Sequence, residues 1–173
     1  MASKIKVDQI QTGDGTGTIA LQNQLSGMTS VSMPTGAVLQ VVQTEGTTQV
    51  TQTATSWTDI SCSASITPIS TSSKIIVHVD NSLYNSASSQ HTSLTVFRGS
   101  VASGTNLGTA SWGFGSIYDG NNDSMCNLSY THLDSPSTTS AITYNCAARV
   151  SGGTGYVFMN SNKGNITLTE IAG

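Results

Sequence analysis

Charged side chains are scarce in this chain. Only 9% of its 173 residues are Asp, Glu, Lys or Arg, against about 25% in an average protein. The six Lys and Arg residues are scattered, and the formal net charge is −3. Since nucleic-acid binding requires clustered cations, we predict that the chain binds no nucleic acid. So little charge also leaves strand edges poorly protected, and oligomerisation that buries those edges is one remedy.

Long apolar runs and strong helix formers are scarce as well. The sequence has no run of 18 apolar residues, so we predict no membrane insertion. The opening MASKIKVDQIQ has no apolar signal core, and we expect no Sec-type export. Ala, Leu, Glu, Lys and Arg are sparse. No window of about 11 residues shows the i, i+3, i+4, i+7 apolar spacing of an amphipathic helix.

Small polar residues are abundant instead. Serine occurs 27 times, threonine 25 times and glycine 17 times, a composition typical of short strands joined by polar turns. About eight to ten short strands follow one another at spacings of roughly 8 to 12 residues. The sequence therefore predicts an all-β protein, an antiparallel jelly roll or β-sandwich.

The last third of the chain has the pattern of two successive β-hairpins, in which cross-strand pairs share a face. A first turn at about Pro136 would set Cys126 opposite Cys146, Leu128 opposite Tyr144 and Tyr130 opposite Ile142. A second turn at about Asn162 would set Phe158 opposite Ile166 and Tyr156 opposite Leu168. Aromatic residues opposite aliphatic ones are pairs that stabilise a sheet.

Three further segments suggest how the rest of the chain is built. AVLQVVQ, residues 37 to 43, is apolar on both faces and predicts a strand buried on both sides. In SKIIVHVDNSLY the alternation places Ile75, Val77 and Val79 on one face, with Ile76, His78 and Asp80 on the other. The glycine- and aromatic-rich residues 100 to 123 predict either a bulged strand or a surface loop.

Residues 1 to 33 form a separate segment, and Met33-Pro34-Thr35-Gly36 is the predicted boundary to a head domain of residues 34 to 173. Two strands as short as those in the first segment cannot bury a core alone. They must pair with the head, with copies of themselves or with a partner protein. The residues predicted to mediate trimerisation or docking are Ile5, Val7, Ile10, Ile19 and Leu21.

The opening KIKVDQIQTGDGTGTIALQNQ, the central STSSKIIVHV and the ending NITLTEIAG resemble small fibre and virion-surface proteins of tailed phages, especially marine and cyanobacterial ones. The resemblance covers most of the chain in order. It implies a homotrimer whose jelly-roll head is similar to the C1q/tumour-necrosis-factor shape and stands on a short N-terminal β stalk. It also implies assembly in the host cytoplasm and a place on the virion surface.

The resemblance has one departure. Long tail fibres begin with an anchoring domain, whereas this chain starts almost at once with the stalk-like segment. The protein is therefore expected to be held by another tail or capsid protein, or to bind the particle through residues 1 to 33. That leaves open a capsid decoration protein, also called a cement or head-fibre protein, in place of a tail tip.

Metal and calcium sites find little support. His78, His91 and His132 show no H-x-H pairing and have no cysteine near them in sequence. The DGNND segment offers Asp119, Asn121 and Asp123, but it lacks the longer pattern and terminal Glu of a calcium loop. We predict neither a metal nor any other cofactor.

Two readings of the cysteines are open. A disulfide between Cys126 and Cys146 is geometrically conceivable in the predicted hairpin. Assembly in a reducing cytoplasm favours free thiols packed as small hydrophobes, and Cys62 is then a third unpaired thiol. We predict free thiols.

Catalytic motifs are missing. No serine lies in G-x-S-x-G, and no Cys–His pair is suggested by neighbouring sequence. The candidates for a glycosidase carboxylate pair are Asp119, Asp123 and Asp134. Phage enzymes that depolymerise polysaccharides, however, are usually far longer chains. We predict that the protein is not an enzyme.

A receptor-binding role is one hypothesis for several aromatic residues and an asparagine, because aromatic rings stack on sugar faces and amides bond to hydroxyls. The alternative is that Trp112 and Phe114 are core residues of a strand. The candidate receptor contacts are Tyr84, Asn85, Trp112, Phe114 and Tyr118.

Three functions compete at this point. The first is a trimeric phage fibre or tail tip that adheres to a host surface polysaccharide or protein by avidity. The second is capsid decoration through the N-terminal arm. The third is a sugar-binding module of cellular origin, against which a trimer would argue.

Overall fold

A computed structural model describes residues 33 to 120 and 124 to 173. The predicted docking residues Ile5, Val7, Ile10, Ile19 and Leu21, and the calcium candidates Asn121 and Asp123, lie outside the described residues. In the part of the chain that is described, no helix is long and apolar enough to cross a membrane.

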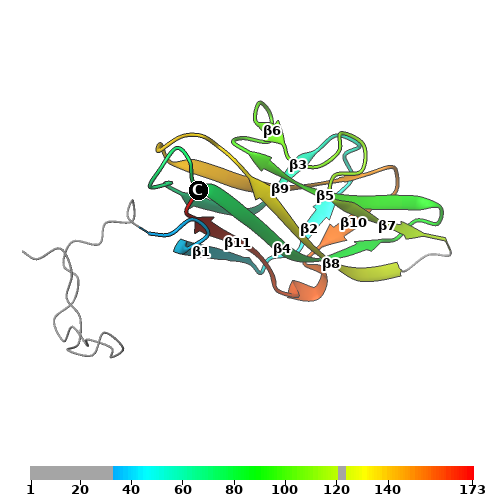
Figure 1. Ribbon diagram of the computed structural model, residues 1–173. Coiled ribbons are helices and arrows are strands. Elements are labelled where there is room, and N and C mark those ends of the chain that lie inside the picture. Colours follow the sequence, from blue (N-terminus) through cyan, green and yellow to red (C-terminus); the bar gives the residue numbers. More distant parts are fainter. Residues whose placement is uncertain (1–32, 121–123) are drawn as a thin grey trace, which may run out of the picture.

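The described chain forms two antiparallel sheets packed face to face (Figure 1). The first sheet consists of β1 (Val38–Gly46), β2 (Val50–Gln52), β4 (Lys74–Asn85), β8 (Ser124–Asp134), β10 (Gly155–Val157) and β11 (Gly164–Ile171). The second consists of β3 (Thr58–Ile66), β5 (Gln90–Arg98), β6 (Thr105–Asn106), β7 (Gly115–Asp119) and β9 (Ile142–Val150). A 3₁₀ turn, η2 (Met159–Ser161), follows β10.

The strand order is that of a jelly roll, which confirms the predicted fold class. The long strands lie in the order β1-β11-β4-β8 in one sheet and β3-β9-β5-β7 in the other. The first long strand, β1, thus pairs with the last, β11, and the second, β3, pairs with the last but one, β9. This is the pairing of a long hairpin wound into two Greek keys. Each long strand, β7 with Ile117 included, carries apolar side chains that pack in or against the core between the sheets.

Both predicted hairpins are wrong. β8 pairs with β4 in the first sheet, whereas β9 pairs with β3 and β5 in the second, so the segment around Pro136 crosses between sheets. β10 and β11 do not face each other either: both pair with β4, one after the other along its length. The alternating pattern was right, but any strand with period-two alternation satisfies it, so local sequence did not identify the partner.

The prediction that residues 37 to 43 are buried on both sides is also wrong. In the described chain, the one ladder partner of β1 is β11, which makes β1 an edge strand. Val38 and Val41 are 56% and 58% exposed. An apolar outer face on an edge strand is a surface that another chain can cover.

The alternation predicted around residues 74 to 85 is confirmed in β4. Ile75, Val77 and Val79 are fully buried in the core, while Ile76 and His78 are half-buried on the outer face. β4 has β8 on one side and β11 and β10 on the other. It is therefore the central strand of its sheet.

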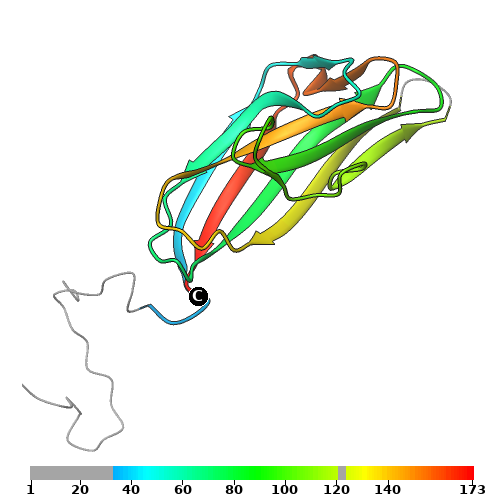
Figure 2. The same ribbon diagram turned by 90° about the horizontal axis from the view of Figure 1, so that it is seen from above.

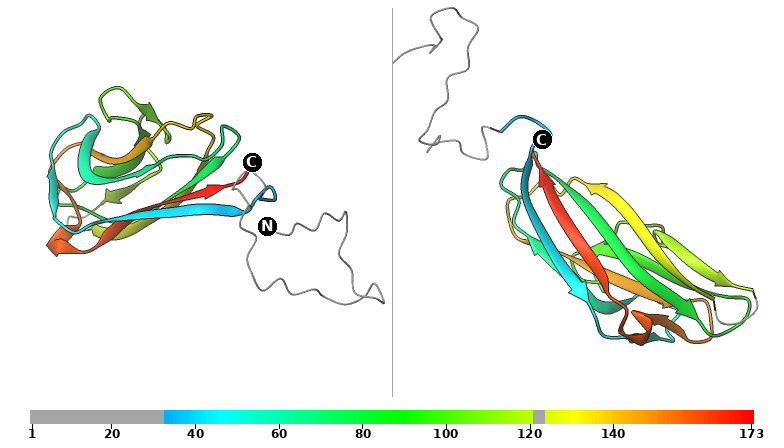
Figure 3. Two further views of the ribbon diagram at one scale, coloured as in Figure 1. Left: turned by 90° about the vertical axis from the view of Figure 1, so that its left-hand side faces the viewer. Right: turned by 90° about the horizontal axis from the view of Figure 1, so that it is seen from below.

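The two ends of the described chain meet at one end of the sandwich. Val38, where β1 begins, pairs with Ile171, where β11 ends. The backbone N–H of Gly36 donates to Ala172 O (2.8 Å), and the N–H of Ala172 donates to the carbonyl of the residue after Gly36 (2.8 Å). Figures 2 and 3 show the C-terminus beside the start of the described chain. We call this the junction end, and the opposite one the far end.

All three cysteines are free, as predicted, but they are not arranged as the hairpin implied. Cys126 pairs in register with Leu83 on β4 and is exposed. Cys146 is buried and follows Asn145, which pairs with Ser63, so the residue opposite it is the equally buried Cys62. A hydrogen bond with Cys62, together with burial, raises the pKa of the Cys146 thiol.

We expect one thiol per folded chain to react with a small thiol reagent and all three to react after unfolding. Reaction needs an accessible thiolate, and Cys62 and Cys146 have 0% exposure. Intact-mass spectrometry counts the adducts, and Cys126→Ser should abolish the native one. Two or more adducts on the folded chain would contradict the buried pair.

Candidate functional site

Three aromatic side chains gather on the outer face of the second sheet. Trp112 meets the His91 ring edge-on, with centroids 4.6 Å apart and planes at 70°. Tyr118 lies against the same ring, with centroids 4.8 Å apart and planes at 44°. Trp112 is 48% exposed and Tyr118 is 54% exposed. We call Trp112, His91 and Tyr118 the aromatic surface.

The strands explain two members of the aromatic surface. His91 and Tyr118 are direct cross-strand partners on β5 and β7. The next residue of β5, Thr92, points inward, where its hydroxyl donates to Tyr84 O of the other sheet (3.0 Å). Because side chains alternate along a strand, His91 and with it Tyr118 must point outward.

A tight loop brings Trp112 over the strand. The backbone of Phe114 donates to Leu94 O (2.8 Å), and Thr109 and Gly113 exchange backbone hydrogen bonds of 2.9 and 3.0 Å. Gly113 has a φ of 62°, and a Cβ there would collide with the backbone of Leu94. Only glycine fits this position, so the loop closes directly on β5 and sets Trp112 against His91.

A second aromatic residue supports the same loop. The indole N–H of Trp57 donates to Ala110 O (3.0 Å). The guanidinium of Arg149 lies 5.4 Å from the centre of the Trp57 ring, within the range of a cation–π contact. Arg149 pairs in register with Ser93, two residues along β5 from His91. The loop of Trp112 is thus bonded to the residue that precedes β3, whose ring in turn contacts β9.

Hydrogen-bonding groups lie beside the rings. The hydroxyl of Ser151 accepts from the backbone N–H of His91 (2.8 Å) and donates to Oε1 of Gln90 (2.8 Å). An array of exposed rings with an amide and a hydroxyl at its margin suits a sugar, whose C–H face packs on rings and whose hydroxyls form hydrogen bonds.

Sequence reasoning missed His91 as part of this surface, and also Trp57 and Arg149. No spacing signal could have found them, because they come from β5, from the residue before β3 and from β9, and only the fold brings these together. Of the predicted contacts, the structure brings Trp112 and Tyr118 to one place.

The other predicted receptor contacts lie elsewhere. Tyr84 is on β4, on the outer face of the first sheet, with its ring 5.6 Å from that of Tyr156. Asn85 is fully buried, where its amide donates to Thr92 Oγ1 (3.0 Å) and its carbonyl oxygen accepts from the N–H of Ala87 (2.9 Å). The side chain of Asn85 is therefore a structural link between sheets, with no exposed atoms to offer a receptor.

Phe114 has a packing role. Its ring is stacked on that of Tyr130, with centroids 4.0 Å apart and planes at 14°. The ring of His132 also stacks against Phe114, with centroids 5.7 Å apart. Phe114 is half-buried. It closes the gap between β7 and β8, the two strands at the same margin of the sandwich.

The histidines are dispersed over the fold. His78 on β4 bonds to Asp80 (2.8 Å) and to Thr131 Oγ1 (2.9 Å), and the hydrogen bond from Ser129 is the main cause of a lowered pKa of Asp80. Within residues 33 to 120 and 124 to 173, no three His, Cys, Asp or Glu side chains converge in a way that could hold a metal ion.

The outer face of the first sheet has its own apolar row. The register aligns Val41 of β1, Thr169 of β11, Ile76 of β4 and Leu133 of β8. Val41 and Leu133 are 58% and 50% exposed. Such a row is unusual on the outside of a solvated sheet.

Comparisons with known proteins give matches of structure alone. No family model matches the chain, and no curated protein matches it in sequence. Similar solved structures include the VP2 subviral particle of infectious bursal disease virus, with a TM-score of 0.46 and 14% identity over 78% of this chain and 33% of that one. The Gx strain of the same virus matches with a TM-score of 0.41 and 12% identity, over 78% and 37%. The chain spans about a third of the length of these viral proteins.

We expect Trp112→Ala and Tyr118→Ala to change the free energy of unfolding by no more than about 1 kcal/mol, as is usual for exposed residues. Phe114→Ala should cost about 1–3 kcal/mol, because it removes a half-buried ring and its stacking contact with Tyr130. Urea unfolding of the three variants measures the difference. A Trp112 variant as unstable as the Phe114 variant would mean that Trp112 serves packing and is not displayed for binding.

Proposed function

We propose that the protein is a virion structural protein, a trimeric fibre or tail tip of a tailed phage that adheres to a polysaccharide on the host surface. The sequence resemblance supports the phage origin. One structural observation supports adhesion: the aromatic surface lies toward the far end, away from the junction end from which the N-terminal arm must leave.

The strand directions give this arrangement. β5 begins with Gln90 and His91 at the far end and ends with Arg98 at the junction end, where β9 begins at Ile142. Tyr118 pairs with His91 near the end of β7. In Figure 1, β7 and the C-terminus accordingly lie at opposite ends of the sandwich. An arm held on the particle would therefore direct the aromatic surface outward.

Avidity is the proposed mechanism. A shallow surface of three rings binds one sugar unit weakly, because little of the ligand is buried. Three such surfaces on a rigid trimer, repeated over many copies per particle, convert later binding events into intramolecular ones. The low charge of the chain fits recognition by stacking and hydrogen bonds, which salt screens little.

The trimer is supported by the apolar row of the first sheet. Val41, Ile76 and Leu133 lie on a face that no other described strand covers. Copies that meet along this face would bury the row and also protect the edge strand β1. The second sheet, with the aromatic surface, would then remain on the outside.

The adhesion proposal predicts saturable binding of the purified full-length chain to cells of the phage host. Replacing both Trp112 and Tyr118 by alanine should weaken that binding by at least about tenfold, since exposed aromatics dominate such contacts and the loss is repeated in every subunit. Flow cytometry with a fluorescent label measures it.

The matched control is Ile69→Ser, which also removes a partly exposed apolar side chain (38% exposed) but lies between β3 and β4 at the junction end. It should bind as the unchanged chain does. Equal loss in the control and the double variant would contradict the aromatic surface as the receptor site. No saturable binding, with antibody label spread over the capsid, would favour the decoration hypothesis instead.

The trimer proposal predicts a solution mass of three times the 17.9 kDa chain mass. Light scattering coupled to size exclusion measures it on the full chain. Leu133→Glu should lower the mass, because it places a charge within the apolar row. A monomer for the unchanged chain would contradict the trimer.

A further inference from the structure

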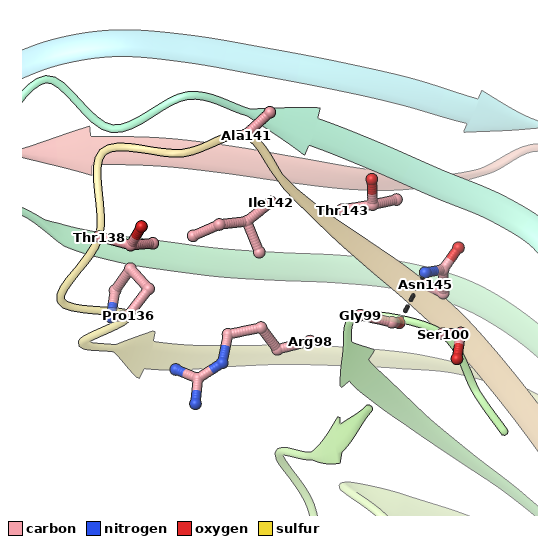
Figure 4. Close-up of a pocket in the computed structure, with 9 residues that line it drawn as sticks. All are labelled: Arg98, Gly99, Ser100, Pro136, Thr138, Ala141, Ile142, Thr143 and Asn145. Carbon is pink, nitrogen blue, oxygen red and sulfur yellow. Dashed lines mark hydrogen bonds between the residues drawn. The ribbon is translucent and has the colours of Figure 1, made fainter. Parts of the chain in front are cut away.

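A pocket separate from the aromatic surface lies at the junction end, on the side of the second sheet. It is a pocket of about 590 Å³, within the usual size range of small-ligand sites, between the segment that follows β5 and the segment that joins β8 to β9. Figure 4 shows its lining: Arg98, Gly99, Ser100, Pro136, Thr138, Ala141, Ile142, Thr143 and Asn145. The aromatic surface shares none of these residues.

The pocket walls are held by hydrogen bonds. The backbone N–H of Gly99 donates to Thr143 O (2.8 Å), and the amide of Asn145 donates to Gly99 O (2.7 Å), which is drawn in Figure 4. Gly99 has a φ of 88°, a conformation that glycine adopts without strain. The turn after β5 is thus preformed against β9, and a ligand would meet an ordered wall.

Arg98 is the charged residue of the lining, and it is fixed in place. Its Nη1 donates to both carboxylate oxygens of Asp134, at 2.8 and 3.0 Å. Asp134 is nearly buried and also accepts from the hydroxyl of Tyr144 (2.8 Å) and the N–H of Ser135 (2.9 Å). Burial and the contact with Asp134 raise the pKa of Tyr144, so that its hydroxyl remains a donor.

This arrangement uses one nitrogen of the guanidinium. In the described chain, no hydrogen bond joins Nε or Nη2 of Arg98 to another residue. These two nitrogens form the edge that binds a carboxylate through two parallel hydrogen bonds. The side chain is about one third exposed and is part of the pocket lining.

The remaining lining suits a hydroxylated ring. Thr138, Thr143 and Ser100 supply hydroxyls, while Pro136 and Ile142 supply apolar contact. No carboxylate is among the lining residues, and the carboxylate of Asp134 behind Arg98 is nearly buried. We propose that this pocket binds an acidic sugar of the hexuronate type, with its carboxylate on the outer edge of Arg98 and its hydroxyls on the threonines.

Titration of the full-length chain with glucuronate, followed by amide chemical shifts, tests the proposal. We expect saturable shifts at Gly99 and Thr143, with a Kd on the order of millimolar, as small weakly buried ligands give. Glucose, which lacks the carboxylate, should bind at least about tenfold more weakly. Equal binding of glucose and glucuronate, or no saturable shift with glucuronate, would overturn the assignment.

Variants separate the carboxylate contact from general effects. Arg98→Lys keeps a cation for Asp134 but loses the planar edge, and it should weaken glucuronate at least about tenfold. Arg149→Lys, at the aromatic surface, is the matched control and should bind glucuronate unchanged. An Arg98→Lys variant that is folded and binds as the unchanged chain does would refute the site.

A second pair keeps the test decisive if Arg98→Lys does not fold. Ala141 is exposed in the segment between β8 and β9, so Ala141→Glu and Ala141→Gln should both fold. The glutamate should weaken glucuronate more than the isosteric glutamine does, because it adds a like charge at the rim. Equal effects of the two, or tighter binding of a short acidic peptide than of glucuronate, would contradict an acidic-sugar site.

The result is independent of host adhesion. The Trp112 and Tyr118 variants should bind glucuronate normally, and Arg98→Lys should leave aromatic-surface binding intact. Failure of the pocket and failure of the proposed function therefore give different outcomes.

Discussion

The pairing of β4 with three other strands is the constraint on which the rest of the structure depends. β8 lies along one side of β4, and β11 and β10 lie in line along the other (Figure 1). Its inward residues Ile75, Val77 and Val79 have no exposed surface and face the second sheet across the core. β4 thus joins segments separated by up to about half the chain in one sheet. Such long-range pairing brings its contacts only after large loops have closed.

The winding of the jelly roll also produces the two different ends. Segments that cross between the sheets must leave one sheet edge and enter the other, and their backbone groups need partners where the ladders stop. At the junction end, the buried Asp134 takes hydrogen bonds from Arg98, Tyr144 and the next backbone N–H. Breaking such a pair by removing one partner is costly, so Arg98 is held in one position. At the far end, Asn85 joins the sheets instead.

The two candidate surfaces differ in how they are preorganised. The aromatic surface is shallow, and its geometry comes from a sheet register and from Gly113, where no side chain fits. The pocket at the junction end is concave, and its charged lining residue, Arg98, is held by the nearly buried Asp134. A flat array of rings suits repeated weak contacts, whereas an anchored guanidinium suits recognition of one charged group. The contrast follows from the positions of the two arginines, one on β9 beneath an indole and one at the end of β5.

Several properties of this protein were determined by its sequence alone. Sparse charge and helix formers, with abundant Ser, Thr and Gly, determined the all-β class, and the alternation of residues 75 to 80 determined which face of β4 is buried. The glycine-rich segment was expected to be a surface loop or a bulged strand, and it holds Trp112 in a loop and Tyr118 on β7, both exposed. These features are local: they depend on propensity and on the period of two, both of which are readable within a few residues.

Only the tertiary structure decided which strands pair, which strand is an edge and which side chains meet. The period-two pattern is the same for a hairpin and for a partner from another part of the chain, so Cys146 faces Cys62 and not Cys126. An apolar strand looks alike in the middle of a sheet and at an edge whose outer face is open, so Val38 and Val41 are exposed. His91 joins Trp112, and Arg98 joins Asp134, because sheet register and crossing segments bring remote residues together, and no short window of sequence contains both partners.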